Sequence, residues 1–271
     1  MKKWNKEKII LDIHNLEKRL KRKPKKRDTT NLYSLSRIYF GTWNNMMEYA
    51  GYKVKRIQRP KIPDSDSDIF YYFLGLLNTD GHIVYDKSNK CYRVLLFTSH
   101  REEKDQIISL IRKLFNYEAS VRKKEFGYAK RINYEIHICS KNLCEFFINK
   151  LSMFSGAKSL TIEISPFVFN SKNSKIWHFI RGVIDGDGSI IKTENSSMLK
   201  IPSGSKKFID GISCLFKKLG FNSGKISQER KNLWLFRITM KEDIKKLYKF
   251  IYSSAGNYYY KRKERIWRQY I

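Results

Sequence analysis

Two segments in different halves of the chain share one pattern: FLGLLNTDGHI at residues 73–83 and FIRGVIDGDGSI at residues 179–190. Each is an apolar run that is interrupted by one glycine and ends in Asp-Gly. The pattern predicts a short buried helix that ends at the Asp, with the next Gly in the left-handed conformation. Gly75 and Gly182, helped by the small residues Thr79 and Gly186, would let two such helices approach closely.

If these helices pack side by side, Asp80 and Asp187 meet at one end of the pair. A carboxylate adds to the negative end of a helix dipole, so two buried carboxylates there are unfavourable without a divalent cation. The alternative is that both acids only cap or pack the helix ends. We favour a cation, and oxygen ligands of this kind suit Mg²⁺.

The two segments resemble the paired motifs of the LAGLIDADG homing endonucleases. Residues 180–188 fit the nine positions of the motif, with Arg181 as the unusual residue, and residues 73–81 fit except that Asn78 replaces the first acid. The metal-binding acid of the family stands at the eighth position, which both copies keep. The resemblance implies a single-chain, two-motif protein that uses Mg²⁺, accepts Mn²⁺, and binds Ca²⁺ without cleavage.

The charge of the chain predicts a polyanionic partner. Among 271 residues, 55 Lys and Arg stand against 26 Asp and Glu, a formal charge of +29, which exceeds what solubility needs. No apolar run is long enough to span a bilayer and no signal peptide is expected, so we expect no membrane role. Four scattered cysteines are typical of a reducing, intracellular compartment. A zinc site at His137, Cys139 and Cys144 is less favoured than ordinary core cysteines.

Residues 1–60 form a separate basic unit, with 17 Lys and Arg against 5 Asp and Glu. Apolar residues at helical spacing predict three short helices, broken at Pro24 and at the turn FGTWNN. The segment resembles the small helical repeat that accompanies many homing endonucleases, which implies an accessory DNA-binding module. The alternative is a helical lid that only packs on the main domain. Residues 61–68, with prolines and charges, predict a linker.

The remaining sequence predicts a structural repeat, with units at residues 69–170 and 171–271. In each unit the motif helix precedes two strands, a helix, a second strand pair and a closing helix. This order predicts an α+β fold: two αββαββα units related by a pseudo-two-fold axis, with the motif helices at the centre, preceded by a small all-helical domain.

The strand pairs predict a DNA-binding surface. Side chains alternate along a strand, so each sheet can bury one face and present polar residues on the other. An antiparallel ribbon fits the major groove, where Arg, Lys and Gln can read base edges. Any single candidate could be only a solvated charge, but the set favours DNA, and the differing units predict an asymmetric target. The candidates are Arg93, Arg122, Lys123, Lys124, Lys130 and Arg131 in the first unit, and Lys192, Lys200, Lys225, Gln228, Arg230, Lys231 and Arg237 in the second.

The resemblance implies metal-dependent hydrolysis of phosphodiester bonds, with a break in both strands across the minor groove. Family members also use one lysine in each half to organise water. In the second half the candidate is Lys263, and Lys261 is its alternative. The implied metal ligands are Asp80, Asp187 and the carbonyl groups of Thr79 and Gly186, and the implied catalytic residues are Asp80, Asp187, Lys158 and Lys263.

Two classes of function stay open. A monomeric, site-specific endonuclease encoded by a mobile intron or another element is favoured, because both motif acids are retained. The alternative is a nonenzymatic relative: an RNA maturase that binds intron RNA, or a DNA-binding regulator. An intein is not expected, because the sequence starts with Met1-Lys2 and ends with Tyr270-Ile271, without a terminal Asn or nucleophile.

Overall fold

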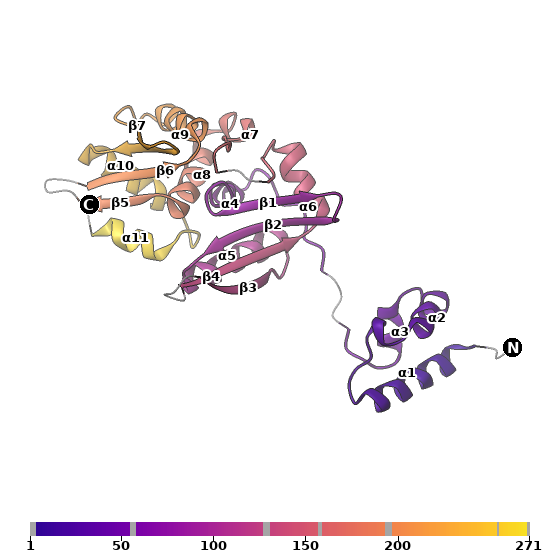
Figure 1. Ribbon diagram of the computed structural model, residues 1–271. Helices are drawn as coiled ribbons and strands as arrows, with labels where there is room; N and C mark the ends of the chain where they lie inside the picture. Colours follow the sequence, from indigo (N-terminus) through magenta and orange to yellow (C-terminus); the bar gives the residue numbers. More distant parts are fainter. Residues whose placement is uncertain are drawn as a thin grey trace. The chain divides into compact units, whose positions relative to one another are not determined.

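The computed structural model describes residues 4–54, 58–126, 131–156, 159–192, 197–253 and 255–269 (Figure 1). Contacts divide the chain into two compact units, which meet at Gln58 and Arg59. Each unit has its own hydrophobic core. Within the described residues, every helix is too short or too polar to cross a membrane.

The first unit is a small helical domain of α1 (Lys6–Leu20), a 3₁₀ turn (Lys26–Asp28), α2 (Thr30–Phe40) and α3 (Trp43–Tyr49). Polar residues cap these helices: Thr42 Oγ1 accepts a hydrogen bond from Asn45 N at 3.1 Å, which satisfies a free amide of the first turn. The Asn45 side chain donates to Phe40 O at 3.0 Å. The FGTWNN segment thus closes the turn between α2 and α3, and Trp43 is buried beneath it.

The second unit contains the predicted repeat. Its first half comprises α4 (Asp68–Thr79), β1 (Gly81–Asp86), β2 (Cys91–Thr98), α5 (Arg101–Phe115), β3 (Ser120–Phe126), β4 (Arg131–Cys139), and α6 (Lys141–Glu145) followed by a π-helical turn (Phe146–Lys150). Its second half comprises α8 (Asn173–Gly186), β5 (Ser189–Lys192), β6 (Ser197–Ser203), α9 (Lys206–Lys218), β7 (Lys225–Arg230), β8 (Leu233–Ile238) and α10 (Lys241–Ser253). Two helices were not predicted: α7 (Pro166–Phe169) and α11 (Lys261–Arg268).

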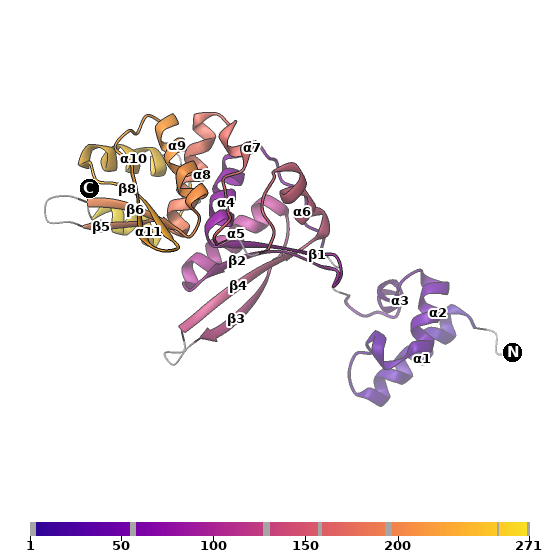
Figure 2. The ribbon, with the colours of Figure 1, turned by 45° about the horizontal axis from the view of Figure 1, so that its top comes forward.

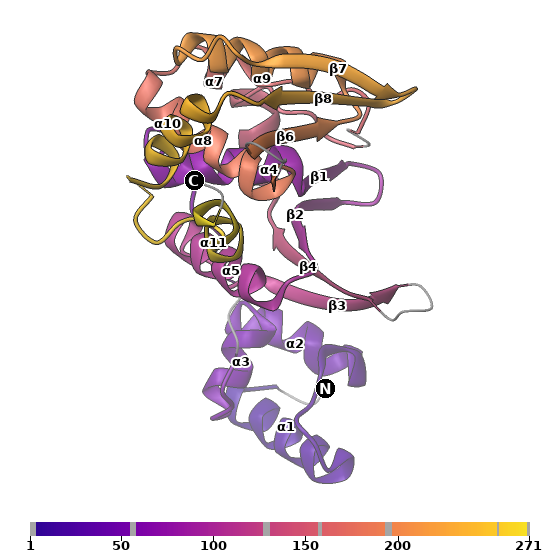
Figure 3. The same cartoon turned by 90° about the vertical axis from the view of Figure 1, so that its left-hand side faces the viewer.

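Both halves form a four-stranded antiparallel sheet with the same strand order, β1-β2-β4-β3 and β5-β6-β8-β7. This shared order confirms the predicted α+β fold of two αββαββα units. In the second unit, α5, α10 and α11 lie on one side and the strands on the other (Figure 3). The β3–β4 pair extends away from the helices (Figure 2). Among the described residues, one face of each sheet is therefore free of helices; we call these two faces the open faces.

The centre of the second unit is the crossing of α4 and α8, whose backbones are in contact. A Cβ atom on Gly75 would lie 2.3 Å from Phe179 O, and one on Gly182 would lie 2.2 Å from Tyr72 O. Real Cβ atoms do not come this close to a carbonyl oxygen, so only glycine fits at either position. The predicted close approach of the two helices is confirmed.

The prediction that the glycines after the two motif acids adopt the left-handed conformation is wrong. Neither Gly81 nor Gly188 has a positive φ, because a strand starts immediately and needs no reversal of the chain. A Cβ atom on Gly81 would lie 2.5 Å from Leu77 O, and one on Gly188 would lie 2.7 Å from Ile184 O. Glycine is required there for space against the last helical turn.

Candidate metal and nucleic-acid site

The ends of α4 and α8 bring together three of the residues predicted for the metal site. A Cβ atom on Gly186 would lie 1.9 Å from Thr79 Oγ1 and 3.2 Å from Asp80 Oδ2, so the end of α8 lies directly against these two residues. The carbonyl of Asp80 also accepts a hydrogen bond from Phe97 N at 3.0 Å, which ties the end of α4 to β2. Asp187 follows Gly186 as the C-cap of α8.

The expectation of two buried carboxylates is corrected by the structure. Asp80 is half-buried, whereas Asp187 is exposed. The reason is that each acid stands one residue beyond its helix, where the chain turns into β1 or toward β5 at the surface of the helix pair. The exposed carboxylate of Asp187 is accessible to a ligand from solvent.

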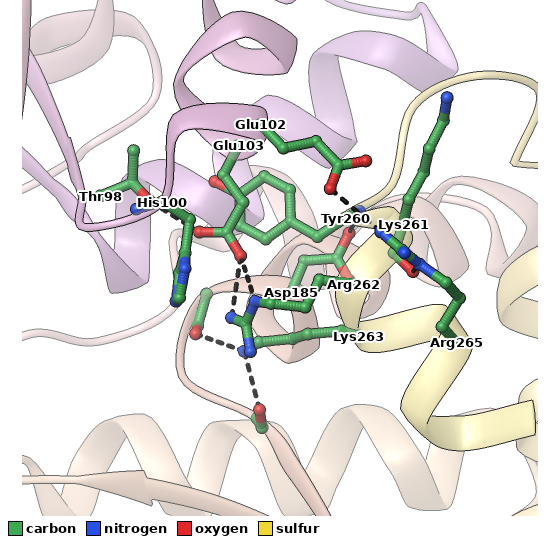
Figure 4. A network of polar contacts seen from close by, with 12 residues as sticks. Thr98, His100, Glu102, Glu103, Asp185, Tyr260, Lys261, Arg262, Lys263 and Arg265 are labelled. Atoms are coloured by element: carbon green, nitrogen blue, oxygen red, sulfur yellow. Dashed lines mark hydrogen bonds and ion pairs between the residues drawn. The ribbon is translucent and has the colours of Figure 1, made fainter. Parts of the chain in front are cut away.

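A lysine occupies the end of α8. Lys263 Nζ donates hydrogen bonds to the carbonyl oxygens of Ile184, Gly186 and Gly188, at 3.0, 2.6 and 2.8 Å (Figure 4). The carbonyls of Ile184 and Gly186 belong to the last turn of α8, the negative end of the helix dipole, and Gly188 follows the C-cap residue. Burial lowers the pKa of Lys263, and the charges of Asp185 and Asp80 partly offset this lowering. The structure thus places Lys263 at the site, while Lys261, its alternative, is exposed.

The buried acid of the second motif is Asp185, which sequence reasoning did not single out. Its side chain is 1% exposed, and its Oδ2 accepts hydrogen bonds from Tyr72 Oη and Tyr260 N, both at 2.8 Å. Burial raises the pKa of Asp185 to about 6, against the lowering effect of these two bonds. Asp185 therefore joins α8 to α4 and to the chain that enters α11. Its counterpart Asn78 donates from Nδ2 to Leu74 O at 2.8 Å, within its own helix.

The unusual Arg181 has a structural explanation. Its side chain is 2% exposed, donates to Ile251 O at 3.1 Å and lies over the ring of Tyr72 at 5.0 Å. A cation above an aromatic face is favourable when desolvated. Burial lowers the pKa of Arg181, and Tyr72 and Asp185 oppose that change. No pattern in the sequence could identify these contacts, because Ile251 and Tyr72 are distant in the chain.

Helix α11 connects the two halves through ion pairs. Arg262 donates from Nε and Nη2 to Glu103 Oε1 at 3.0 and 2.8 Å, and Arg265 Nη2 lies 3.1 Å from Glu102 Oε2 (Figure 4). Glu103 is buried, whereas the second pair is exposed. These pairs were not predicted, because the sequence analysis did not predict α11.

The open face of the second sheet carries a row of cations. Lys200 is opposite Arg237 on the neighbouring strand, and Arg237 is opposite Lys225 on the next. Directly opposite residues share a face, and like charges in this arrangement repel. Arg230 lies on the same face beyond a bulge in the β7–β8 register. This row of cations therefore favours an anionic partner.

The first sheet presents Arg93, Arg122 and Lys124 on its open face, opposite Cys139, Glu135 and Asn133 respectively. Lys124 Nζ lies 2.5 Å from Glu135 Oε1, so part of the positive charge is neutralised within the sheet. Among the described residues, the two open faces thus differ in charge.

Three of the residues predicted to contact DNA lie away from the open faces. Lys123, Lys192 and Gln228 share the faces of the core residues Ile136, Leu199 and Phe236, because strand positions alternate. Gln228 Nε2 also donates to Lys231 O at 3.0 Å, within the β7–β8 turn that contains Lys231. Lys130, Lys158 and the side chain of Arg131 lie outside the described residues.

The donor atoms at the helix ends fit a hard divalent cation. The carboxylates of Asp80 and Asp187 and the carbonyl of Gly186 offer only oxygen, the ligand type of Mg²⁺ and Ca²⁺. The bonds of Lys263 show that the carbonyls at the end of α8 accept a cation. Within the described residues, no three His, Cys, Asp or Glu side chains gather as a metal cluster. The zinc alternative gains no support there, since Cys139 is exposed and Cys144 is buried against Val84 O.

Comparison with solved structures establishes the fold. Mesophilic variants of the homing endonuclease I-DmoI match with a TM-score of 0.55 and 20% identity, over 75% of this chain and 98% of that chain. The homing endonuclease I-WcaI bound to its DNA recognition sequence matches with a TM-score of 0.53 and 14% identity, over 73% of this chain and 85% of that chain. The structure is the two-unit LAGLIDADG fold.

Comparison with sequences identifies the same domain. Residues 174–252 match the family model described as a LAGLIDADG-like domain. The DNA-directed RNA polymerase subunit Rpo1C of Methanocaldococcus jannaschii is 28% identical over 173 residues, which is 62% of this chain and 18% of that protein. A glutamine–fructose-6-phosphate aminotransferase of the same organism is 26% identical over 174 residues, 64% of this chain and 15% of that protein. The chain therefore spans less than a fifth of these relatives.

Proposed function

We propose that the protein is a site-specific DNA endonuclease that hydrolyses a phosphodiester bond in each strand of a long, asymmetric target. The observation that carries this proposal is the close approach of Asp80 and Gly186 at the ends of the two motif helices, in a unit whose sheets carry cations on their open faces. I-DmoI has been solved in complex with DNA and Mn and in complex with DNA and Ca. These neighbours support double-stranded DNA as the partner and a divalent metal as the cofactor.

Each part of the site has a separate role in this proposal. Asp80 and Asp187, with the carbonyls of Thr79 and Gly186, would hold Mg²⁺ or Mn²⁺. When bound, the metal would lower the pKa of a water molecule and stabilise the leaving oxygen. Lys263 holds a positive charge beside Gly186, where the negative charge of a phosphate would approach. The single chain supplies both halves, so we propose that it acts as a monomer.

The cations of the open faces would bind the phosphates and base edges of the duplex. The residues that the structure supports for this role are Arg93, Arg122, Lys124, Lys200, Lys225, Arg230 and Arg237. Because many phosphate contacts release counterions, the affinity for DNA should fall steeply as salt rises. A binding constant that does not change with salt would contradict this role.

The first unit would add contacts to DNA outside the central target. Its surface carries most of the 17 Lys and Arg of residues 1–60, while Ile9, Ile13 and Trp43 fill its core. We propose that it is an accessory DNA-binding module of the homing-endonuclease-associated type. Deletion of residues 1–58 should weaken DNA binding without abolishing cleavage.

Carriage by a mobile element is supported by the curated relatives. Two of them are named for unrelated activities, an RNA polymerase subunit and an aminotransferase, yet each shares a segment of about the same length with this chain. We therefore propose that this chain derives from a mobile element such as an intron-encoded gene.

The decisive experiment is cleavage of a randomised double-stranded DNA library with Mg²⁺, in parallel with Ca²⁺. We expect discrete cut sites with Mg²⁺ and binding without cutting with Ca²⁺. Asp80→Asn and Asp187→Asn should bind the recovered target and fail to cut it, while Asp210→Asn, on the remote helix α9, should behave as wild type. If either motif variant cleaved at the wild-type rate, the assignment of that carboxylate as a metal ligand would be wrong.

A nonenzymatic binder is the second candidate, and one observation favours it. The ammonium of Lys263 already satisfies the Gly186 carbonyl, so the helix ends can be neutralised without metal. A protein of this kind would bind DNA as a regulator, or intron RNA as a maturase. Target binding without cleavage in either metal, with or without competition by intron RNA, would establish it.

A further inference from the structure

We propose that Glu103 is a positioning residue that fixes Lys263 at the end of α8 through its ion pair with Arg262. The inference rests on the proposed nuclease function, because it assigns a role in that reaction to a residue outside the site. In this proposal, a residue of the first half of the fold holds in position a lysine that comes from the second half. One target strand should then depend on Glu103 more than the other.

The composition of α11 shows why the helix needs this partner. Its first turn contains three cations, Lys261, Arg262 and Lys263, against one acid, Glu264, and its N-cap residue Tyr260 makes no side-chain capping bond. The N-terminus is the positive end of a helix dipole, so three cations in the first turn destabilise it. Glu264 offsets only one of these three charges, so negative charge from other elements stabilises the helix further.

The first half supplies that charge from a buried, fully bonded carboxylate. Glu103 is 5% exposed; its Oε1 accepts two hydrogen bonds from Arg262, and its Oε2 accepts one from Thr98 Oγ1 at 2.6 Å. Just before α11, Tyr260 N donates to the buried Asp185. Figure 4 shows these groups together at the start of α11. Because both oxygens of Glu103 are held, the position of Arg262 is restricted.

Lys263 follows Arg262 directly, so a restriction of one restricts the backbone of the other. Successive side chains on a helix differ in direction by about 100°, which turns Lys263 from α5 toward α8. The charge of Asp80 acts on Lys263, and Asp80 also lies against Gly186. Glu103 therefore acts on the part of the site that contains Asp80 and Gly186.

The test is Glu103→Gln, with Glu102→Gln as the matched control. Glutamine keeps the shape of Glu103 and one oxygen that can accept from Arg262, but it removes the charge. Glu102 is the preceding residue on the same helix, and its pair with Arg265 is exposed, with side chains 46% and 63% accessible. An exposed pair contributes little to structure, so this control should behave as wild type.

Single-turnover cleavage should be followed on each labelled strand of the recovered target. We expect Glu103→Gln to slow one strand by about 10- to 100-fold, because small displacements of a reacting group have effects of this size. Nicked DNA should accumulate while the other strand is cut at the wild-type rate. Arg262→Gln should give the same result, and the double variant should be no slower than either single one. Equal slowing of both strands, or none, would overturn the proposal.

Hydrogen exchange in the DNA-free protein tests the contact without any activity. We expect residues 260–268 to exchange faster in Glu103→Gln and at the wild-type rate in Glu102→Gln. Unchanged exchange in Glu103→Gln would overturn the positioning role. If the wild-type protein cut neither strand, the proposed nuclease function would fail while this measurement still decided whether Glu103 holds α11.

Discussion

The crossing of α4 and α8 makes Gly182→Ala a severe change despite the small size of the added group. The new Cβ atom would lie 2.2 Å from Tyr72 O, 2.9 Å from Gly75 Cα and 2.9 Å from Leu76 N. All three are backbone atoms, which cannot turn away as side chains can. The helices would have to separate by about 1 Å to restore ordinary contact distances.

The size of the effect follows from two opposing contributions. Overfilling a packed core costs up to about 3 kcal/mol. Alanine is favoured over glycine inside a helix by about 1 kcal/mol, which leaves a net destabilisation of about 2 kcal/mol. For a unit of this size, that corresponds to a melting temperature about 4–8 °C below wild type.

Thermal unfolding followed by circular dichroism provides the measurement, with Gly211→Ala in α9 as the control. There the nearest atoms belong to the side chains of Ile164 and Phe169, at 3.1–3.2 Å, and these can shift. Gly75→Ala should resemble Gly182→Ala, and the double variant should lose less than the sum, because one separation of the helices admits both methyl groups. Wild-type stability of Gly182→Ala, or strict additivity, would refute this reasoning.

Three further predictions concern other parts of the chain. Burial lowers the pKa of His178 to about 4. The free energy of unfolding should therefore fall as the pH drops from about 6.5 toward 4, because in this range the unfolded chain binds a proton that the folded chain does not. Urea unfolding at pH 7.5 and 4.5 should show a smaller fall for His178→Gln than for the wild type. Arg237→Gln relieves repulsion from its two neighbouring lysines, so it should leave the free protein equally or more stable in thermal melts while weakening DNA binding. Thr42→Ala removes a helix cap and should destabilise the first unit by about 1 kcal/mol, measured by urea unfolding of residues 1–58, with unchanged cleavage.

The two-unit architecture could be predicted because its signals are local. The apolar-Gly-apolar run ending in Asp-Gly defines each motif helix, and the order of strands and helices after it repeats in the chain. Gly75 and Gly182 indicated the close crossing because a residue without a side chain lets two helix backbones touch, and the structure shows such contact there. The conformation of Gly81 and Gly188 could not be predicted in the same way, because it depends on the strand that follows.

The candidate site was predictable only in part. Asp80 and Gly186 follow from the motif, but the burial of Asp185 depends on Tyr72 and Tyr260, which come from other elements. Runs of basic residues in a strand led to too many predicted DNA-contacting residues. Side chains alternate along a strand, so only about half of them lie on the open face. Helix α11 escaped prediction because its first turn opposes the helix dipole and is held by distant acids.

The alternation of side chains in β6 and β8 has a consequence for how finely a target could be sampled. Residues on one face of a strand are about 6.6–6.8 Å apart, while successive base pairs are separated by about 3.4 Å. A strand lying along the groove would therefore meet every second base pair, and the intervening ones would fall to a neighbouring strand. Retargeting the protein by a single base pair would then require matched substitutions on adjacent strands, such as those that carry Lys200 and Arg237.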